Sequence, residues 1–247
     1  MKINFLWIGD SLSKIGQLSL KSFADNGHEP VLWVYNKNCA NIPPGVTIED
    51  AGQIIHPSKI FSYKGNGDCR LNSYGGFSDI FRYYLINTVG GWYCDMDVTC
   101  LKNFETISSN EYILRPHNTT TVVGNIIKAP SSCAFLDACI YDTELEINEN
   151  NNRWVKPLEI LNKNVQKFNL TRFIVDKCVF GNDDIFELRK YLAIGFYESE
   201  FNLPEYAIHW CNEAVTTGQW DRQVKRDWEK PLPTTLYYKL LKKHKLL

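Results

Sequence analysis

Hydrophobic residues in the first part of the chain follow the order strand, helix, strand. Ile3 to Ile8 is an apolar run typical of a buried strand, and it ends at the turn Gly9-Asp10-Ser11. Apolar positions at helical spacing predict a helix from about Ser13 to Asn26, and Val31 to Tyr35 predicts a second strand. The short connections favour a parallel α/β sheet, in which ligands bind at the carboxyl ends of the strands.

The middle of the chain predicts one long helix and several shorter elements. Residues 76–89 have apolar positions at helical spacing, with Ser78 as the expected N-cap and Gly90-Gly91 as the end. In the segment Gly91 to Leu101 apolar and polar residues alternate, and this segment leads out of a strand. Residues 36–76 look irregular, with one short helix around Ile48 to Ile55. The remaining apolar runs predict strands at Tyr112 to Leu114, Thr120 to Ile127 and Phe173 to Val175, and helices at Ser131 to Tyr141 and Asn152 to Gln166.

Length, charge and cysteine pattern restrict the class of protein. The 247 residues are enough for a single large domain with a deep cleft, and we expect one domain over residues 1–247. A net charge of −1 lacks the cationic surface that nucleic-acid binding needs, so any bound nucleotide is expected to be a small molecule. Eight cysteines without a C-x-x-C pair support neither a zinc ribbon nor a thioredoxin-type site.

The two ends of the sequence and its cysteines predict a location in the cytoplasm. Residues 1–10 lack the apolar stretch of a signal peptide, and no segment approaches the roughly 18 apolar residues needed to span a bilayer. We therefore expect free thiols in a reducing compartment. Residues 221–247 end in TLYYKLLKKHKLL, a basic amphipathic tail that is expected to pack on the domain or to lie at a membrane surface; a solvated terminal helix is the alternative.

Two carboxylates, Asp95 and Asp97, stand two residues apart just after the Gly90-Gly91 turn. In an extended strand both side chains point to the same face. Carboxylates in this arrangement suit Mg²⁺ or Mn²⁺, hard cations that keep coordination sites for the oxygens of a phosphate. Taken alone, the triplet is more often an exposed pair at the end of a strand, so the flanking residues decide its meaning.

These flanks carry a resemblance to a known family. Ser78-Asp79-x-x-Arg82-Tyr83 followed by Gly90-Gly91-x-Tyr93-x-Asp95-x-Asp97 resembles the glycosyltransferase family with a sugar-binding region containing the DXD motif. That family includes capsular-polysaccharide and lipo-oligosaccharide transferases, α-1,4-galactosyltransferases and, more distantly, the clostridial glucosylating toxins. Phe5-Leu6-Trp7-Ile8-Gly9 and Ala207-Ile208-His209-Trp210 resemble its opening strand and its C-terminal His-Trp pair. The resemblance implies a GT-A type fold, a single nucleotide-binding domain whose mixed, mainly parallel sheet is flanked by helices, and transfer with retention of configuration.

The resemblance also implies a role for each matching residue. Trp7 would stack on the base, with Ile8, Gly9 and Ser78 close to the nucleoside. Asp79 and Arg82 would bind hydroxyls of the donor sugar, and Asp95 would contact the ribose and the sugar. The metal, Mn²⁺ or Mg²⁺, would be bound by Asp97, by His209 and, through water, by Asp95. Asp79, Arg82, Asp95 and Asp97 would form the catalytic set.

Each assignment has a structural alternative. Trp7 on a buried strand is commonly a core residue, and Arg82 could simply pair with Asp79 three residues earlier. Near His209, Asn212 or Glu213 could supply an oxygen ligand instead. The clostridial toxins have an acid, a hydroxyl and a Trp near the C-terminus of this domain. This sequence does not reproduce that pattern clearly, although Trp220 lies nearby. The identity of the second metal ligand therefore stays open. Two further polar pairs are explained by turn chemistry: Gly124-Asn125, which resembles a loop facing the cleft, and Asp183-Asp184, which reads as a turn or helix cap rather than a nucleophile.

The expected reaction transfers a hexose or N-acetylhexosamine from a UDP-sugar. The expected acceptor is a bacterial surface glycan or glycolipid, with a possible peripheral contact at the cytoplasmic face of the inner membrane. Two other classes stay open from the sequence: a toxin-like effector that glycosylates a host protein, and a non-catalytic protein that binds nucleotide sugars. Retention of both Asp95 and Asp97 argues against the second.

Overall fold

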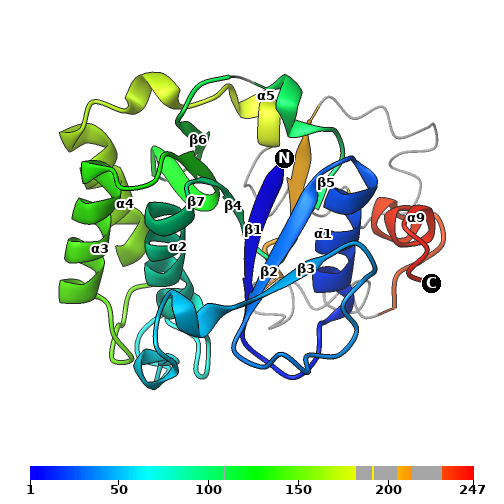
Figure 1. Ribbon diagram of the computed structural model, residues 1–247, viewed down its shortest axis with the longest axis horizontal. Helices are drawn as coiled ribbons and strands as arrows, with labels where there is room; N and C mark the ends of the chain where they lie inside the picture. Colours follow the sequence, from blue (N-terminus) through cyan, green and yellow to red (C-terminus); the bar gives the residue numbers. More distant parts are fainter. Residues whose placement is uncertain (108, 119, 182–190, 192–204, 213–229) are drawn as a thin grey trace.

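The protein is built around a mixed sheet of six strands in the order β3-β2-β1-β4-β7-β6 (Figure 1). The computed structural model describes residues 1–107, 109–118, 120–181, 191, 205–212 and 230–247. β1 pairs in parallel with β2 and with β4, and β2 pairs in parallel with β3. β7 runs antiparallel to both β4 and β6. The strands are β1 Lys2–Trp7, β2 Glu29–Val34, β3 Thr47–Asp50, β4 Gly91–Cys94, β6 Ile113–Pro116 and β7 Val122–Ala129.

The N-terminal strand, helix and strand are as the apolar pattern predicts. β1 and β2 are connected by α1 (Lys14–Asp25), and the side chain of Ser13 caps the start of this helix by accepting a hydrogen bond from the Gly16 N–H at 3.2 Å. Gly27 follows the helix with a positive φ of 84°, a conformation that favours glycine. The prediction of a mixed, mainly parallel sheet flanked by helices is thereby confirmed.

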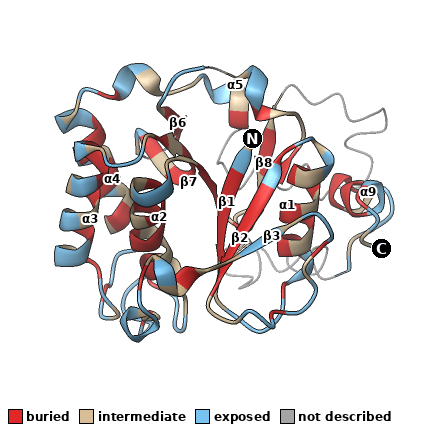
Figure 2. Ribbon diagram, viewed as in Figure 1, coloured by how far each residue is buried: buried red, intermediate tan, exposed pale blue. Residues whose placement is uncertain are grey.

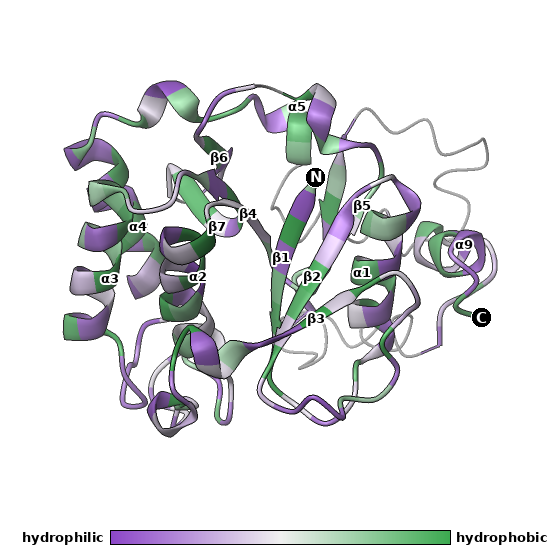
Figure 3. Ribbon diagram, in the orientation of Figure 1, coloured by the Kyte–Doolittle hydropathy of each residue, from purple (hydrophilic) through white to green (hydrophobic). Residues whose placement is uncertain are grey.

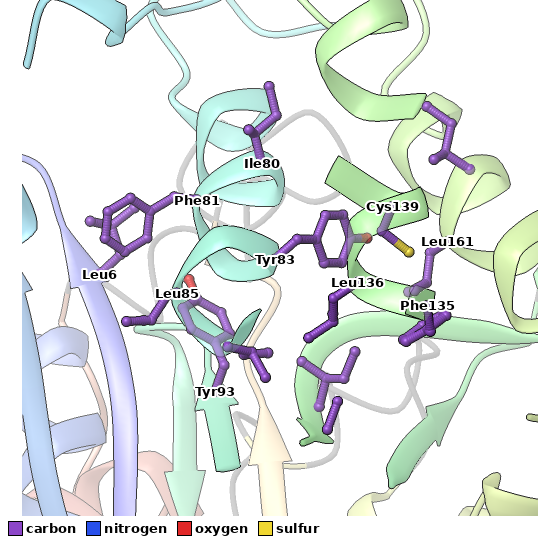
Figure 4. Close-up of a cluster of buried hydrophobic side chains, with 14 of the residues drawn as sticks. Leu6, Ile80, Phe81, Tyr83, Leu85, Tyr93, Phe135, Leu136, Cys139 and Leu161 are labelled. Carbon is purple, nitrogen blue, oxygen red and sulfur yellow. The ribbon is translucent and has the colours of Figure 1, made fainter. Parts of the chain in front are cut away.

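Helices cover both faces of the sheet. α1 packs Leu20 and Phe23 onto Phe5 and Leu32 on one face. On the other face lie α2 (Gly75–Val89), α3 (Ala134–Glu146) and α4 (Lys156–Lys167), whose inner sides are buried and apolar while their outer sides are exposed (Figures 2 and 3). Figure 4 shows how α2 divides this second core: Phe81 lies beside Leu6 of β1, whereas Tyr83 points towards α3.

A second, two-stranded sheet joins the C-terminal part of the chain to the main sheet. β5 (Val98–Cys100) pairs antiparallel with β8 (Ala207–His209). The terminal helix α9 (Leu236–Lys243) packs on the outer side of α1, where Leu236, Tyr237, Leu240 and Leu241 are buried with Trp210. None of the helices in the described ranges is long and apolar enough to cross a membrane. The apolar side of α9 is buried against α1 and Trp210.

Two predicted elements are wrong. The expected helix around Ile48 to Ile55 is instead strand β3 followed by a short 3-10 turn at Ala51–Gln53, because residues 47–50 extend the parallel sheet beside β2. Phe173 to Val175 is not a strand: a 3-10 turn covers Thr171–Phe173, and Ile174 makes a single bridge to Leu114. Both errors arise where pairing with a distant segment decides the local conformation.

Buried His28 predicts a loss of stability in mild acid. His28 is 5% exposed, and its Nε2 accepts a hydrogen bond from the Phe104 N–H at 3.0 Å. Burial lowers the pKa of His28 from its ordinary 6.5 to about 4. Below pH 6.5 the imidazole of His28 is protonated in the unfolded chain, whereas in the folded chain it stays neutral down to about pH 4. The free energy of unfolding therefore decreases as the pH falls through this window. We expect a loss of about 2 kcal/mol between roughly pH 7 and pH 5.

Urea unfolding of the wild type and of His28→Gln at these two pH values measures the effect. The glutamine amide offers an acceptor but does not titrate, so its pH dependence should be smaller by the same amount. An equal pH dependence in the two proteins would contradict the assignment.

Candidate active site

The strand order reverses between β1 and β4, and the region outside the carboxyl ends of these two strands is called the crevice below. From β1 the chain passes through α1 to β2 on one side, while β4 is its parallel neighbour on the other side, with Asn4 opposite Tyr93. Such a reversal of strand order is where open α/β sheets bind ligands. Trp7 ends β1, and Asp95 follows β4 directly. The structure therefore brings together two predicted site residues that are 88 positions apart in the sequence.

Asp95 and Asp97 occupy a turn, not an extended strand as predicted. β4 ends at Cys94, and the Val98 N–H donates to the Asp95 carbonyl at 3.2 Å, which closes the turn before β5. The expected side-by-side orientation on one strand face is therefore wrong. The two carboxylates are instead held by different partners, one from α2 and the other from the segment after β8.

Arg82 holds Asp95 together with Asp79. Its Nη1 lies 3.0 Å from Asp79 Oδ1 and its Nη2 lies 3.0 Å from Asp95 Oδ1. The guanidinium is 6% exposed and sits 5.2 Å from the centre of the Tyr93 ring. Burial opposes its charge, but the two carboxylates outweigh that effect and raise the pKa of Arg82. Burial raises the pKa of Asp95, and Arg82 counteracts this rise.

Gly124 of β7 leaves the space that Arg82 fills. A Cβ atom at Gly124 would lie only 2.4 Å from Arg82 Nη1. The backbone of β7 thus forms one wall of the guanidinium site, and only glycine permits this approach. The predicted pair of Asp79 and Arg82 is confirmed as a contact, and it extends to Asp95.

Ser78 is not the N-cap of α2. The helix begins at Gly75 after Tyr74, so Ser78 lies in its first turns, and its Oγ is 3.2 Å from the Tyr93 hydroxyl. The prediction that Ser78 is the N-cap of this helix is therefore wrong. Asp79 is held by Arg82 instead, and both face the end of β4.

Asp97 is fixed by the segment that follows β8. Its Oδ2 accepts a hydrogen bond from the Asn212 N–H at 2.8 Å and lies 3.4 Å from His209 Nε2. Although burial alone would raise the pKa of Asp97, His209 and the Asn212 N–H lower it below its ordinary value. Trp210 anchors this segment, because its N–H donates to the Asp97 carbonyl at 2.9 Å and its indole donates to Thr99 Oγ1 at 2.7 Å.

These groups have the chemistry of ligands for a divalent cation, although they are not gathered into a complete site among the described residues. Asp97 offers an ionised carboxylate, His209 an imidazole and Asp95 a second carboxylate, all on segments that end at the same crevice. Their side chains keep between 16% and 25% of their surface exposed, so they can be reached from solvent. Within the described ranges no cluster of three or more His, Cys, Asp or Glu is close enough to form a complete metal site. Glu213 and Trp220, named as alternatives from the sequence, lie outside the described residues, as do Asp183 and Asp184.

Trp7 lies at the other side of the crevice. It is partly buried against the apolar residues around β1, and its Nε1 has no hydrogen-bond partner among the described residues. Gly9 comes so close that a Cβ atom there would lie 3.1 Å from this nitrogen, while Ile8 packs towards α2. The indole N–H of Trp7 is therefore a buried donor without a partner among the described residues, at the end of β1.

Asn125 is a site residue that the sequence did not reveal. The pair Gly124-Asn125 is not in a loop or turn as interpreted, but inside strand β7. The Asn125 carbonyl accepts a hydrogen bond from the Asp95 N–H at 2.8 Å, and its side chain is 2% exposed. Neither side-chain atom has a partner among the described residues. A buried amide without partners is costly, so it marks a position suited to a polar ligand.

One family model matches the part of the chain that contains most of these residues. Residues 53–114 match the family model of the glycosyltransferase sugar-binding region containing DXD motif. The match covers Ser78, Asp79, Arg82, Asp95 and Asp97, so the family predicted from the sequence is confirmed. A search of curated protein sequences finds no match.

Three solved structures show similarity at low identity. The PaToxG glycosyltransferase is 15% identical, with a TM-score of 0.48 over 68% of each chain. The apo form of the glycosyltransferase GlyE of Streptococcus pneumoniae TIGR4 is 14% identical, with a TM-score of 0.46 over 92% of this chain and 59% of that one. Mouse xyloside xylosyltransferase 1 is 8% identical, with a TM-score of 0.43 over 86% and 99%.

The mixed sheet, with the Asp-x-Asp turn at the end of β4, agrees with the GT-A type fold that the family resemblance implies. Residues 53–114 of the chain are similar to the DXD-containing sugar-binding region of glycosyltransferases. This family implies a nucleotide-sugar donor, a glycan acceptor and, in general, a divalent metal.

Proposed function

We propose that the protein is a retaining, metal-dependent glycosyltransferase that transfers a hexose or N-acetylhexosamine from a UDP-sugar. The observation that carries this proposal is the convergence of Trp7, Asp95 and Asp97 at the reversal of strand order. An aromatic platform for a base and carboxylates for a cation at this crevice are what a nucleoside diphosphate donor requires.

Asp97 and His209 would hold Mn²⁺ or Mg²⁺, with Asp95 as a partner through water. When bound, the cation supplies positive charge that neutralises the departing diphosphate. Asn212 supports this role, because its N–H keeps the Asp97 carboxylate in place. Asp97 is ionised at neutral pH, since its pKa is lowered, and it is therefore ready to act as a ligand.

The donor sugar would lie against the group formed by Asp79, Arg82, Asp95 and Asn125. Arg82 orients both carboxylates, and each carboxylate retains lone pairs that can accept from sugar hydroxyls. The unpartnered amide of Asn125 can both donate to and accept from the sugar. On the other side Trp7 would stack on the uracil, next to Ile8, Gly9 and Ser78.

Retention is what the family resemblance implies, and the partners of the described carboxylates bear on how it would be achieved. Asp79 and Asp95 are bound to Arg82, and Asp97 is bound by the Asn212 N–H and faces His209. Each of the three carboxylates is therefore already bound by a group of the protein. We therefore propose that the acceptor hydroxyl attacks the anomeric carbon on the face from which the diphosphate departs.

The proposed acceptor is a bacterial surface glycan or glycolipid, assembled in the cytoplasm. All eight cysteines are free thiols, which supports a reducing compartment. A peripheral contact with the inner membrane would use the lysines of α9, such as Lys242 and Lys243, because the apolar residues of this helix are buried.

A donor-hydrolysis assay tests this function. The protein is incubated with a panel of UDP-sugars and other nucleotide sugars, with Mn²⁺ or with a chelator, and released nucleoside diphosphate is measured. We expect release from at least one UDP-hexose or UDP-N-acetylhexosamine, dependent on the metal. Release that is unaffected by the chelator, or that is confined to donors with other nucleotides, would contradict the proposal.

A further inference from the structure

Two loops meet at the rim of the sheet where the candidate active site lies. The first, residues 63–74, leads into α2, and the second, residues 148–154, connects α3 to α4. Because α2 ends next to the start of β4, its beginning lies at the carboxyl end of β4. α3 runs antiparallel to α2, with Asn87 bonded to Asp137 at one end and Tyr84 bonded to Glu144 towards the other. Both loops, here called the double loop, therefore lie at the same edge of the sheet as the carboxyl end of β4, which Asp95 follows (Figure 1).

The double loop is tied together by backbone contacts. The Lys64 N–H donates to the Glu149 carbonyl at 2.9 Å, and the Asp68 N–H donates to the Asn152 carbonyl at 3.1 Å. The Trp154 N–H donates to Asp68 Oδ1 at 2.7 Å. The two segments are thus fixed relative to one another. A surface fixed in this way loses less conformational entropy when it binds a ligand.

Large apolar side chains stand exposed on this surface. Leu71 is 61% exposed, Trp154 is 50% exposed and Tyr74 is 42% exposed. Exposed aromatic residues clustered on one pair of loops are typical of a binding surface, because they offer a large rigid contact area at low entropic cost. The apolar C–H faces of a sugar ring pack well on such flat side chains.

The remaining side chains of the double loop are polar but nearly balanced in charge. The double loop has three basic residues, Lys64, Arg70 and Arg153, and two acidic residues, Asp68 and Glu149. Lys64 pairs with Glu149 at 3.2 Å. Amide side chains, each of which can donate and accept hydrogen bonds, predominate among its exposed polar residues. These exposed asparagines are Asn66, Asn72, Asn148, Asn150 and Asn152. Aromatic faces with amides and little net charge complement a neutral glycan rather than a polyanion.

A hollow adjoins the double loop. It has a volume of about 410 Å³ and is lined by apolar residues that include Phe61, Phe77 and Ile147. Phe61 lies just before the first loop and Ile147 just before the second. The ion pair between Lys59 and Glu144, 3.8 Å apart, borders the hollow. The surface is therefore concave beside the residues that precede the two loops, and ligand sites are usually concave.

We propose that the double loop binds the acceptor as a neutral oligosaccharide, with Trp154 and Leu71 as its main apolar contacts. This inference rests on the proposed function, since it places the second substrate beside the donor site of the same enzyme. It assigns a class of acceptor, a chain of uncharged sugars, to a surface outside the donor-binding residues.

Binding to an array of immobilised neutral oligosaccharides tests the inference. We expect the wild type to bind at least one of them, and Trp154→Ala to bind it about tenfold more weakly because the stacking surface is lost. Leu71→Ser should weaken the same binding, whereas Trp154→Phe should retain most of it. Tyr141→Ala is the matched control: Tyr141 is a 68% exposed aromatic residue on α3 outside the double loop, and its removal should leave binding within about twofold.

The inference is overturned if the wild type binds no neutral oligosaccharide, or if Trp154→Ala binds as tightly as Tyr141→Ala. Donor hydrolysis by the wild type, measured in the same preparation, separates the two proposals. Hydrolysis without glycan binding overturns only the acceptor surface, and glycan binding without hydrolysis overturns only the proposed donor chemistry.

Discussion

Replacement of Asp97 by alanine is expected to lower both sugar transfer and donor hydrolysis by about a thousandfold or more. Asp97 is the carboxylate that faces His209, and it would be the direct ligand of the cation that neutralises the diphosphate. Loss of this ligand removes charge stabilisation of the diphosphate, which is needed most as the donor bond breaks. Measurement of released nucleoside diphosphate with saturating Mn²⁺ gives the effect directly.

Asp97→Asn separates the loss of charge from the loss of structure. An asparagine side chain can still accept from the Asn212 N–H, so the variant should fold like the wild type while losing most activity. Asp137→Ala is the matched control, because this exposed carboxylate bonds Asn87 between α2 and α3, away from the crevice. Wild-type turnover by both Asp97 variants would reject the metal role.

Replacement of Arg82 by methionine is expected to lower the free energy of unfolding by about 3–5 kcal/mol and to abolish transfer. The guanidinium is 6% exposed and bonds Asp79 and Asp95, so its removal leaves two carboxylates close together without compensation. Arg82→Lys should also be impaired, because a single ammonium group cannot reproduce the fork that reaches both partners. Chemical denaturation and donor hydrolysis measure the two effects.

Arg153→Met is the matched control for the loss of an ion pair. Arg153 pairs with Glu159, but its side chain is 55% exposed, so solvent screens the interaction. We expect this variant to lose less than about 1 kcal/mol and to retain donor hydrolysis. If Arg82→Met is no less stable than Arg153→Met, the buried bridge does not organise the site as described.

The sequence predicts the parts of the fold that depend on local patterns. The apolar run of β1, the capped helix α1 and the run of β2 are each specified by nearby residues, such as Ser13 at the helix start. The same holds for α2, which ends at Gly90 with a positive φ of 69°. The contact of Asp79 with Arg82 also follows from helical spacing.

The parts that could not be predicted depend on contacts between distant segments. β3 forms because residues 47–50 pair with β2, and the irregular composition of this region hides that pairing. Asn125 resembles a turn residue in sequence, yet β4 and β6 on either side hold it inside β7. His209 reaches Asp97 because β8 pairs with β5, placing it opposite Val98 across 111 positions of sequence.

The turn at Asp95 and Asp97 shows why the spacing of a motif does not fix its geometry. Two positions of separation predict a shared face only if the backbone stays extended, but β4 ends at Cys94. The turn directs Asp95 to Arg82 and Asp97 to His209. The two carboxylates can therefore serve different tasks, one towards the sugar and the other towards the cation.

Calorimetric titration of UDP into the protein tests most directly whether a cation at Asp97 joins the chain to the donor diphosphate. The account predicts that UDP binds at least about tenfold more tightly with Mn²⁺ than with a chelator, and that Asp97→Asn abolishes this difference. Equal affinity for UDP with and without Mn²⁺, or an unchanged effect of Mn²⁺ in Asp97→Asn, would contradict it.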